Sequence, residues 1–407
     1  MEIRGIRESE LAEMIDLQCK VFLPDGHARY SSYVREDQSY QPEQTRVVVV
    51  NGRIVATLRI WEREMRIGGE CVVRMGGIGG VCTHPEHRGA GYATAMLEDA
   101  IAYMRASGYD LSVLFSIIPC GFYRRLGWAC VPMEGVCITR RRTIRLKDTD
   151  WEVMPFNEER DLEAVATFYN EYNAQQSGSI VRLRPYWDMG PSRIRGVLPT
   201  VVARRGETLG GYLNFQIEDG HAQINELAYN PTDITGLLAL TNHFLRLCDQ
   251  QKVEDIRAEI PHRHPMVDLL IEGTTGDLAL TGTTSMMARV INLPNLLRQL
   301  LPQLRSRLNA SNEQFAPVSI CFEINGQQAV LQLDDSGQLQ VFDTSAHVVP
   351  LAIPERFFWR ALLGESGWSR LEPTVRAGGT SMARGISALL SVLFPQQEVV
   401  FWGPDHY

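Results

Sequence analysis

The chain carries at residues 81–93 the sequence Val-Cys-Thr-His-Pro-Glu-His-Arg-Gly-Ala-Gly-Tyr-Ala. The apolar run from Gly77 to Thr83 predicts a strand that ends at the His-Pro pair. After the glycines, apolar residues recur at helical spacing and predict an amphipathic helix. Its buried face should hold Ala93, Met96, Leu97, Ala100, Ile101 and Met104. The stretch is therefore expected to connect a strand to a helix through two glycines.

Glycines at the beginning of a helix leave its first backbone N–H groups uncovered, and the helix end adds about half a positive charge there. A diphosphate can bind at such a position, and Arg88 supplies a permanent cation at its edge. The stretch lacks the Gly-x-Gly-x-x-Gly spacing of dinucleotide sites and the Gly-Lys-Ser/Thr of phosphate loops. A turn followed by a helix cap is the structural alternative.

A second motif, Gly-Phe-Tyr-Arg-Arg-Leu-Gly-Trp at residues 121–128, follows a strand expected over 111–118. The two motifs resemble motifs A and B of the GNAT acyltransferases, which hold coenzyme A. The resemblance implies that the pantetheine arm lies along Val81, Cys82 and Thr83. It implies that the diphosphate is surrounded by Arg88, Gly89, Ala90, Gly91, Tyr92, Ala93 and Thr94.

Tyr123 of the second motif matches the residue whose hydroxyl lies near the thioester sulfur in GNAT enzymes. Acyl transfer from a thioester expels a thiolate, and a phenol with a pKa of about 10 can protonate it as it leaves. The structural alternative for Tyr123 is a half-buried aromatic ring whose hydroxyl bonds to the backbone.

Length and composition are those of a globular protein of two or three domains. Of the 407 residues, 22% are charged and 44% are hydrophobic. The net charge of −8 argues against sequence-independent binding of nucleic acid, which needs a cationic surface. No apolar run reaches the length of about 18 residues that spans a membrane, and the N-terminus lacks a signal-peptide core. We therefore expect a cytoplasmic protein without a membrane span.

The eight cysteines are spread singly along the chain, and no Cys/His cluster has the spacing of zinc ligands. We expect reduced thiols and no metal. Cys82 and Cys120 lie near the expected site, but neither motif places a base beside its cysteine. Both are therefore expected to be small packing residues.

The order of predicted elements indicates an α/β (α+β) chain of three domains. Residues 1–145 are expected to form a catalytic mixed-sheet domain. Residues 146–292 look like a degenerate copy, in which Asp233 stands near the diphosphate position and would repel it. Residues 293–407 begin with a leucine-rich helix, followed by three alternating strands and two further helices.

A catalytic GNAT domain, a degenerate GNAT-like domain and a C-terminal sterol-carrier-like α/β domain together resemble the enhanced-intracellular-survival (Eis) acetyltransferases. The stretch 284–293 also resembles the beginning of that family's third domain. Several family members acetylate aminoglycosides. The resemblance implies an acetyl-CoA-dependent N-acetyltransferase for aminoglycoside-like or polyamine acceptors, assembled as a homo-hexamer.

The same resemblance implies that the terminal carboxylate, on Tyr407, returns to the catalytic domain as the general base. Full proton transfer from an alkylammonium to an α-carboxyl is uphill by about 6 pKa units, or about 8–9 kcal/mol. This cost would therefore have to be lowered by a raised carboxyl pKa or a lowered amine pKa, or avoided by binding of the free amine. His406 is the alternative base, because its ordinary pKa lies nearer neutrality. It is also a candidate contact for the substrate.

The loop over residues 23–45 lies where GNAT proteins cover the acceptor. It carries Asp25, Glu36, Asp37 and Glu43, two arginines and three tyrosines. An acidic lid suits a polyamine or an aminosugar, and Asp25 is the expected contact for an ammonium group. A solvated surface loop is the alternative. Two other functions stay open: acetylation of a protein lysine or N-terminal amine, and a lipid-binding module with a regulatory coenzyme A site.

Overall fold

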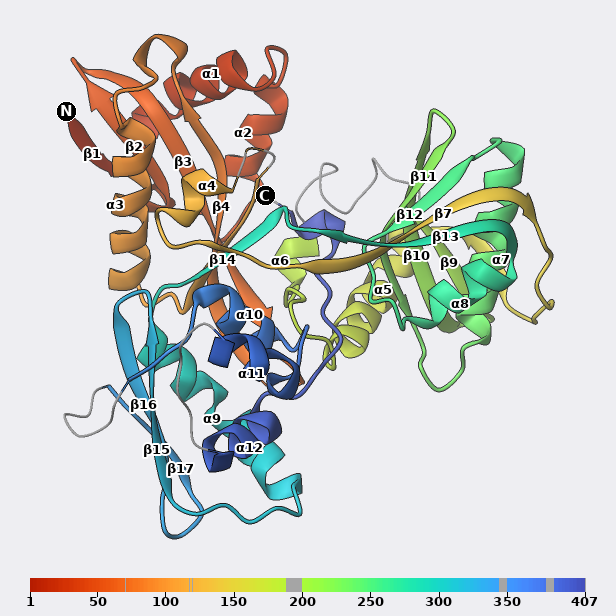
Figure 1. The fold of residues 1–407 in the computed structure, drawn as a ribbon. Coiled ribbons are helices and arrows are strands. Elements are labelled where there is room, and N and C mark those ends of the chain that lie inside the picture. Colours follow the sequence, from red (N-terminus) through yellow and green to blue (C-terminus); the bar gives the residue numbers. More distant parts are fainter. Residues whose placement is uncertain are drawn as a thin grey trace. The chain divides into compact units, whose positions relative to one another are not determined.

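The structure is a computed structural model that describes residues 1–69, 71–116, 118, 120–187, 200–343, 350–377 and 384–406. These residues form two compact units. Unit 1 consists of residues 1–131 and 284–397, and unit 2 of residues 132–283 and 398–406. The fold is mixed α/β, as expected, with a seven-stranded sheet in each unit and a four-stranded sheet in unit 1 (Figure 1).

The larger sheet of unit 1 has the strand order β1-β2-β3-β4-β5-β14-β6. Its strands are β1 (Glu2–Gly5), β2 (Thr45–Val50), β3 (Arg53–Arg66), β4 (Val72–Thr83), β5 (Leu111–Phe115), β14 (Met286–Val290) and β6 (Ala129–Cys130). Only β4 and β5 pair in parallel, and the other neighbours in this sheet are antiparallel.

Helices cover both faces of this sheet (Figure 1). They are α1 (Leu11–Val21), α2 (His27–Arg35), α3 (Tyr92–Ala106) and α4 (Gly121–Arg124), with the short 3-10 helices η1 (Glu8–Glu10), η2 (Pro42–Gln44) and η3 (Pro85–His87). Val48 packs in the cluster of α3, whereas Val47 and Val49 pack in that of α1, because alternate residues of a strand point to opposite faces. The expected apolar face of α3 is buried, apart from Ala93, which stays partly exposed.

The smaller sheet of unit 1 has the order β17-β16-β15-β18. Its strands are β15 (Val318–Ile324), β16 (Gln327–Leu333), β17 (Leu339–Phe342) and β18 (Pro350–Ala352), and its helices are α9 (Leu293–Ala310), α10 (Glu355–Leu363), α11 (Trp368–Ala377) and α12 (Arg384–Leu393). Asn325 and Gly326 join β15 to β16 with φ of 51° and 70°, which makes the hairpin turn that an Asn-Gly pair favours. The likeness of this part to sterol carriers stays a prediction.

Unit 2 repeats the strand arrangement with the order β8-β9-β10-β11-β12-β7-β13. Its strands are β7 (Met133–Thr143), β8 (Glu152–Pro155), β9 (Thr200–Arg205), β10 (Thr208–Glu218), β11 (His221–Tyr229), β12 (Asp255–Ala258) and β13 (Thr274–Thr283). Its helices are α5 (Glu158–Asn173), α6 (Arg184–Trp187), α7 (Thr235–Gln250), α8 (Pro265–Glu272) and η4 (Gly403–Asp405). In both sheets the fourth and fifth strands form the parallel pair, which confirms the expected structural copy.

In unit 2, helix α7 follows the fourth strand of the sheet, and it begins differently from α3 of unit 1. The Asp233 carboxylate accepts a hydrogen bond from the Thr235 N–H at 3.1 Å and lies 3.6 Å from the Arg205 guanidinium. A carboxylate of the chain itself thus accepts a hydrogen bond from a backbone N–H group in the first turn of α7. The absence of a diphosphate site from unit 2 stays a prediction.

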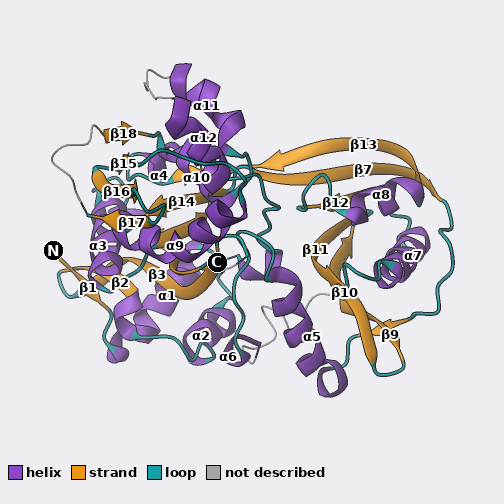
Figure 2. Cartoon of the chain, turned by 90° about the horizontal axis from the view of Figure 1, so that it is seen from below, coloured by secondary structure: helices purple, strands orange, loops and turns teal. Residues whose placement is uncertain are grey.

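The chain exchanges strands between the two larger sheets. Residues 133–143 were expected in the first domain, but they form β7 and pair with β12 and β13 in unit 2 (Figure 2). Residues 286–290 were expected in the second domain, but they form β14 and pair with β5 and β6 in unit 1. Hydrophobic patterning predicts that such segments are strands and does not say which sheet they join. The division into three domains at 145 and 292 stays a prediction.

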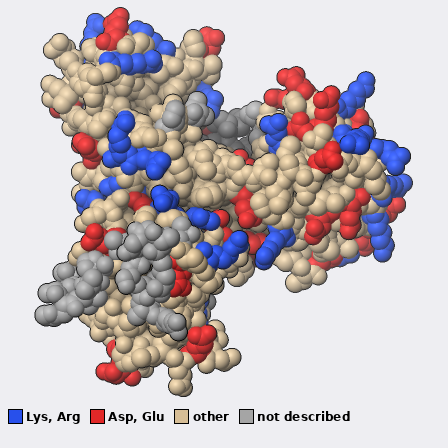
Figure 3. All heavy atoms as spheres, viewed as in Figure 1, with Lys and Arg blue, Asp and Glu red and all other residues tan. Residues whose placement is uncertain are grey.

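No helix in the described ranges combines the length and apolarity needed to cross a bilayer. On the face in Figure 3, Lys and Arg are interspersed with Asp and Glu.

A buried ion network lies in unit 2 around Arg182, whose side chain is fully buried. Arg182 Nη1 donates to Glu226 Oε1 at 3.0 Å, and its Nε donates to Asp405 Oδ1 at 3.0 Å. Tyr186 and Tyr212 donate their hydroxyl groups to Asp405 and Glu226 at 2.6 and 2.7 Å. Burial raises the pKa of Glu226, against the opposing effect of Arg182. The network ties residue 405, near the end of the chain, into the core of unit 2.

Arg182→Met should therefore destabilise unit 2, because it leaves two buried carboxylates without their cation. We expect a loss of about 3–5 kcal/mol, measured by urea unfolding. Arg184→Met is the control, because this arginine is 48% exposed and pairs with the exposed Glu163; removing such a pair costs about 1 kcal/mol or less. Equal unfolding midpoints for the two variants would show that the network does not hold unit 2 together.

Candidate active site

Strand β4 carries a β-bulge at Gly80. Thr57 of β3 lies opposite Cys82, and Arg59 lies opposite Gly79, so that two residues of β4 face the single residue between them on β3. Gly80 has a φ of 62°, and a Cβ there would lie 2.9 Å from Gln18 Nε2. Glycine adopts this conformation without the steric cost that a Cβ adds. The bulge bends β4 and changes the direction of its last residues.

The end of β4 is also left open on the side of β5. The parallel pairing runs only from Met75 to Ile78, which lies opposite Leu114. Strand β5 ends at Phe115, whereas β4 continues to Thr83. Within the described ranges, no strand pairs with this side of β4 beyond Ile78. An extended ligand can therefore bond to this backbone as an added strand would.

The loop between β4 and α3 exposes the beginning of the helix. Gly89 and Gly91 have φ of 81° and 80°, and a Cβ at either position would meet no atom within 4 Å. The Ala95 N–H donates to the Gly91 carbonyl at 3.1 Å. The N–H groups that precede Ala95 are those that a helix leaves without an internal acceptor. The loop therefore offers donors around an open space.

One cavity of about 470 Å³ joins these features. It is lined by Val21, Phe22, Val81, Cys82, Thr83, His87, Arg88, Gly89, Gly91, Tyr92, Ala93, Thr94, Ile118, Phe122 and Tyr123. The structure thus brings together every residue predicted for coenzyme binding except Ala90, which is exposed outside the lining. Sequence analysis missed Val21, Phe22, His87, Ile118 and Phe122. His87 lies inside the first motif and Phe122 inside the second, so both could have been predicted from the sequence as residues that line the cavity.

Tyr123 lies on α4 and is 7% exposed. Its ring packs edge-on against Phe122 and Trp128, with centroids 5.0 and 6.3 Å away. The Tyr123 carbonyl accepts from the N–H groups of Leu126 and Trp128 at 3.0 and 3.1 Å, which fixes the turn that follows α4. Burial raises the pKa of the phenol, so it stays protonated at neutral pH and can act as an acid.

Cys82 lines the same cavity, and its thiol is poorly suited to act as a nucleophile. Cys82 is 4% exposed, and burial raises its pKa to about 12. The reactive form of cysteine is the thiolate, so the expectation of a packing role fits its surroundings. As far as the described residues go, no cluster of three metal-ligating side chains is present.

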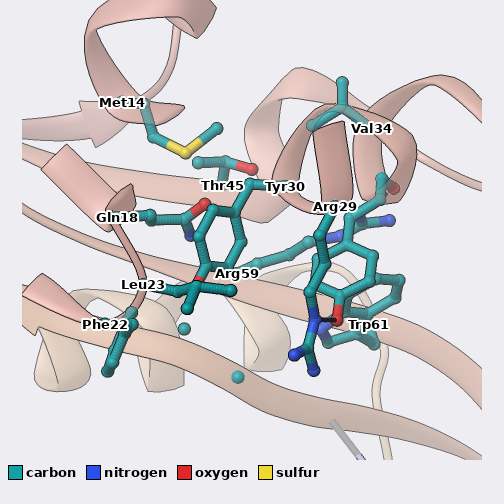
Figure 4. Close-up of a pocket in the computed structure, with 13 residues that line it drawn as sticks. Met14, Gln18, Phe22, Leu23, Arg29, Tyr30, Val34, Thr45, Arg59 and Trp61 are labelled. Carbon is teal, nitrogen blue, oxygen red and sulfur yellow. Dashed lines mark hydrogen bonds between the residues drawn. The ribbon is translucent and has the colours of Figure 1, made fainter. Parts of the chain in front are cut away.

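A second cavity of about 410 Å³ adjoins the first (Figure 4). It is lined by Met14, Gln18, Phe22, Leu23, Arg29, Tyr30, Tyr33, Val34, Thr45, Arg59, Trp61, Gly79 and Gly80. Phe22 belongs to both linings, and Gly79 and Gly80 directly precede Val81 of the first cavity. The bulge of β4 therefore stands between the two spaces, where a second reactant could meet a ligand in the first.

The acidic residues of the segment 23–45 do not line the second cavity. Asp25 is exposed and belongs to neither lining. Asp37 is buried and forms ion pairs with Arg59 at 2.6 Å and Arg63 at 3.2 Å. Burial disfavours its charged form, but Arg63, Arg59 and the bonds from Ser39 outweigh this and lower its pKa. The role of Asp25 stays a prediction.

The two candidates for the general base lie at the end of the chain. His406 belongs to unit 2, where its ring lies 5.8 Å from that of Phe401. Burial lowers the pKa of His406. Tyr407 lies outside the described residues. Their roles as base and substrate contact stay predictions.

Solved structures with this fold extend over the whole chain. A probable N-acyltransferase of Enterococcus faecalis V583 is 17% identical, with a TM-score of 0.77 over 100% of this chain and 99% of its own. A GCN5-related N-acetyltransferase of Anabaena variabilis is 14% identical, with a TM-score of 0.72 over 100% of both chains. Eis1 of Mycobacterium abscessus is 18% identical, with a TM-score of 0.68 over 99% of both. At these identities, the likeness shows the fold.

A sequence comparison identifies the part of the chain that holds both cavities. No curated protein matches the chain in sequence. Residues 2–131 match the family model of the acetyltransferase (GNAT) domain, and all residues that line the two cavities fall within this range. Residues 2–131 are therefore a GNAT acetyltransferase domain, and the protein is an enzyme of the acyltransferase class.

Proposed function

We propose that the protein transfers the acetyl group of acetyl-CoA directly to the primary amine of a small acceptor. One observation carries the proposal: a single cavity joins the open edge of β4, the uncovered beginning of α3 and the phenol of Tyr123. These are the groups that an extended thiol ester with a diphosphate needs along its length. The GNAT domain match over residues 2–131 supports the same chemistry.

Each part of acetyl-CoA has a proposed contact. The amide groups of the pantetheine arm bond to the backbone of Val81–Thr83, where β4 lacks a partner from β5. The diphosphate lies at the beginning of α3, between Arg88 and the N–H groups of residues 89–94. This arrangement directs the thioester toward Tyr123.

The transfer needs no covalent intermediate on the enzyme. The free amine attacks the thioester carbon, a C–N bond forms, and the carbonyl oxygen takes the negative charge beside the backbone of the bulged strand. The C–S bond then breaks, and Tyr123 gives its proton to the sulfur. The nitrogen loses its extra proton to the general base, for which the terminal carboxylate on Tyr407 and His406 are the two candidates. At the ordinary pKa values of about 8.5 for a thiol and about 10 for a phenol, the proton transfer to the sulfur is uphill by about 2 kcal/mol, and the raised pKa of the buried Tyr123 adds to that cost. It is therefore expected to accompany C–S cleavage.

Aminoglycoside-like and polyamine acceptors are proposed from the resemblance to the Eis family, and the fold of Eis1 agrees with that resemblance. The homo-hexamer and the sterol-carrier-like nature of residues 293–407 are proposed from the same resemblance, and the cytoplasmic location is proposed from the eight singly spread cysteines. A thiol-release assay with acetyl-CoA and a panel of amines tests the activity. If the folded protein binds acetyl-CoA but acetylates no amine or peptide, the proposed function is wrong.

Gly89→Ala and Gly91→Ala should weaken the binding of coenzyme A. A side chain at their φ costs about 1–2 kcal/mol, and because no neighbouring atom would clash, the change acts through the backbone of the loop. We expect the Kd from calorimetry to rise about tenfold. Gly385→Ala in α12 is the control, because it adds a methyl group in open space without a positive φ. Unchanged affinity in all three variants would place the diphosphate elsewhere.

Tyr123→Phe should lower kcat by about 100-fold or more, because the leaving thiolate loses its acid. The Kd for coenzyme A should stay within about twofold, since the ring and its packing remain. Tyr103→Phe is the matched control, because this tyrosine lies on α3 outside both cavities. A Tyr123→Phe enzyme with the kcat of the Tyr103→Phe enzyme would exclude the phenol as proton donor.

A further inference from the structure

The helix that contains Tyr123 is too short to be stable by itself. Helix α4 consists of the four residues Gly121–Arg124, and isolated helices of this length do not form in water. The turn that follows it, residues 126–128, donates two backbone N–H groups to the Tyr123 carbonyl, from Leu126 and Trp128. Contacts that hold this turn therefore also hold Tyr123.

Arg289 of β14 contacts this turn from outside the GNAT match at residues 2–131. Its Nη1 donates to the Leu126 carbonyl at 2.5 Å, and its guanidinium carbon lies 5.6 Å from the centre of the Trp128 ring. The guanidinium occupies the place of a side chain at residue 127, since a Cβ on Gly127 would collide with it. Gly127 also has a φ of 86°, where a side chain would be strained. The absence of a side chain at Gly127 thus leaves room for Arg289.

Asn325 contacts the same turn from the hairpin between β15 and β16. Its Nδ2 donates to the Gly127 carbonyl at 3.0 Å. The same nitrogen donates to Glu355 Oε2 of α10. A side-chain amide nitrogen has two hydrogens, so both have an acceptor here. Asn325 therefore connects the turn after α4 with α10.

Glu355 fixes Asn325 and the end of β14 at the same time. Its Oε1 accepts from the Val290 N–H at 2.9 Å and from Trp359 Nε1 at 3.1 Å, while its Oε2 accepts from Asn325. Burial raises the pKa of Glu355 to about 7, against the opposing effect of these bonds and of Arg289. The charged form, which is the stronger hydrogen-bond acceptor, therefore predominates above pH 7.

We propose that Arg289 and Asn325 are positioning residues for the phenol of Tyr123, and that Glu355 holds Asn325 in place. The two side chains fix the carbonyl groups of the turn, and the N–H groups of the same turn fix α4. The proposal rests on the proposed role of Tyr123 as the acid. It extends the catalytic machinery beyond residues 2–131, because the part of the chain that forms the four-stranded sheet then acts on the reaction.

The position of these side chains separates orientation from ligand binding. Arg289, Asn325 and Glu355 belong to the lining of neither cavity. Their removal should therefore leave the contacts to coenzyme A intact and change only how α4 presents Tyr123. The effect on kcat should then depend on the presence of the phenol.

Asn325→Gly and Arg289→Met test this dependence in a double-mutant cycle with Tyr123→Phe. Glycine is chosen because Asn325 has a φ of 51°, which glycine adopts without strain. At pH 8, where Glu355 is mainly charged, each variant should lower kcat about tenfold when Tyr123 is present. In the Tyr123→Phe background the loss should be less than about twofold, because no acid is left to position. The Kd for coenzyme A should stay within about twofold throughout.

Gln327→Ala and Arg305→Met are the matched controls and should leave kcat unchanged. Gln327 lies in the same hairpin and bonds to Val290 and Leu293 at 3.3 and 3.1 Å. Arg305 Nη2 donates to the Leu339 carbonyl at 2.6 Å, as Arg289 does to another carbonyl. Among the residues described, neither side chain bonds to residues 121–128. Equal losses of kcat in the two backgrounds, or in the controls, would show general destabilisation and overturn the proposal.

A fluorine label on Tyr123 provides a readout that does not depend on activity. Fluorotyrosine incorporated at this position alone gives one fluorine NMR resonance, whose shift and width report on the surroundings of the ring. Asn325→Gly and Arg289→Met should shift or broaden this resonance, whereas Gln327→Ala and Arg305→Met should not. A resonance that is the same in all four variants would overturn the positioning role.

The outcomes separate this inference from the proposed function. A Tyr123→Phe enzyme with unchanged kcat, or a folded protein that acetylates no amine, contradicts the proposed function, and the fluorine resonance then decides the positioning role. A slow Tyr123→Phe enzyme contradicts the inference alone if Asn325→Gly and Arg289→Met keep the kcat of their controls.

Discussion

The left-handed conformation of Gly80 is the constraint on which the active site depends. It lets two residues of β4 face one residue of β3, and the strand then continues past the point where β5 stops pairing with it. The same glycine belongs to the wall of the second cavity, and its neighbour Val81 to that of the first. One backbone irregularity thereby lies next to the open edge of β4 and between the two cavities. A side chain at this position would be strained and would also press on Gln18.

The structural features that the sequence predicts correctly are those set by local rules. Apolar spacing over α3, the glycines before it and the Asn325-Gly326 turn each depend on a few neighbouring residues. The second cavity could not be predicted in this way, because Arg59 and Trp61 come from β3 and Arg29 from α2. Asp37 was counted as an acidic group of a lid, yet two arginines of β3 enclose it. A charge count over a segment says nothing about which side chains tertiary structure neutralises.

The strand exchange shows a second limit of local patterning. The segments 133–143 and 286–290 both look like strands, and both are. Their partners, however, are fixed by hydrogen-bond register with residues more than a hundred positions away or across a whole inserted unit. The buried network around Arg182 has the same long-range character, since it joins residues 182, 226 and 405. The pattern of residues within one short segment carries no information about such long-range pairings.

The position of β14 also constrains how this enzyme can be made. The acetyltransferase sheet contains residues 286–290 between β5 and β6, so it is incomplete when residue 131 leaves the ribosome. A nascent chain must hold the edge of β5 unpaired while the whole intervening unit is synthesised, and unpaired strand edges invite aggregation. A fragment cut after the GNAT homology region would keep that exposed edge permanently. The catalytic machinery is thus encoded early in translation and becomes whole only late.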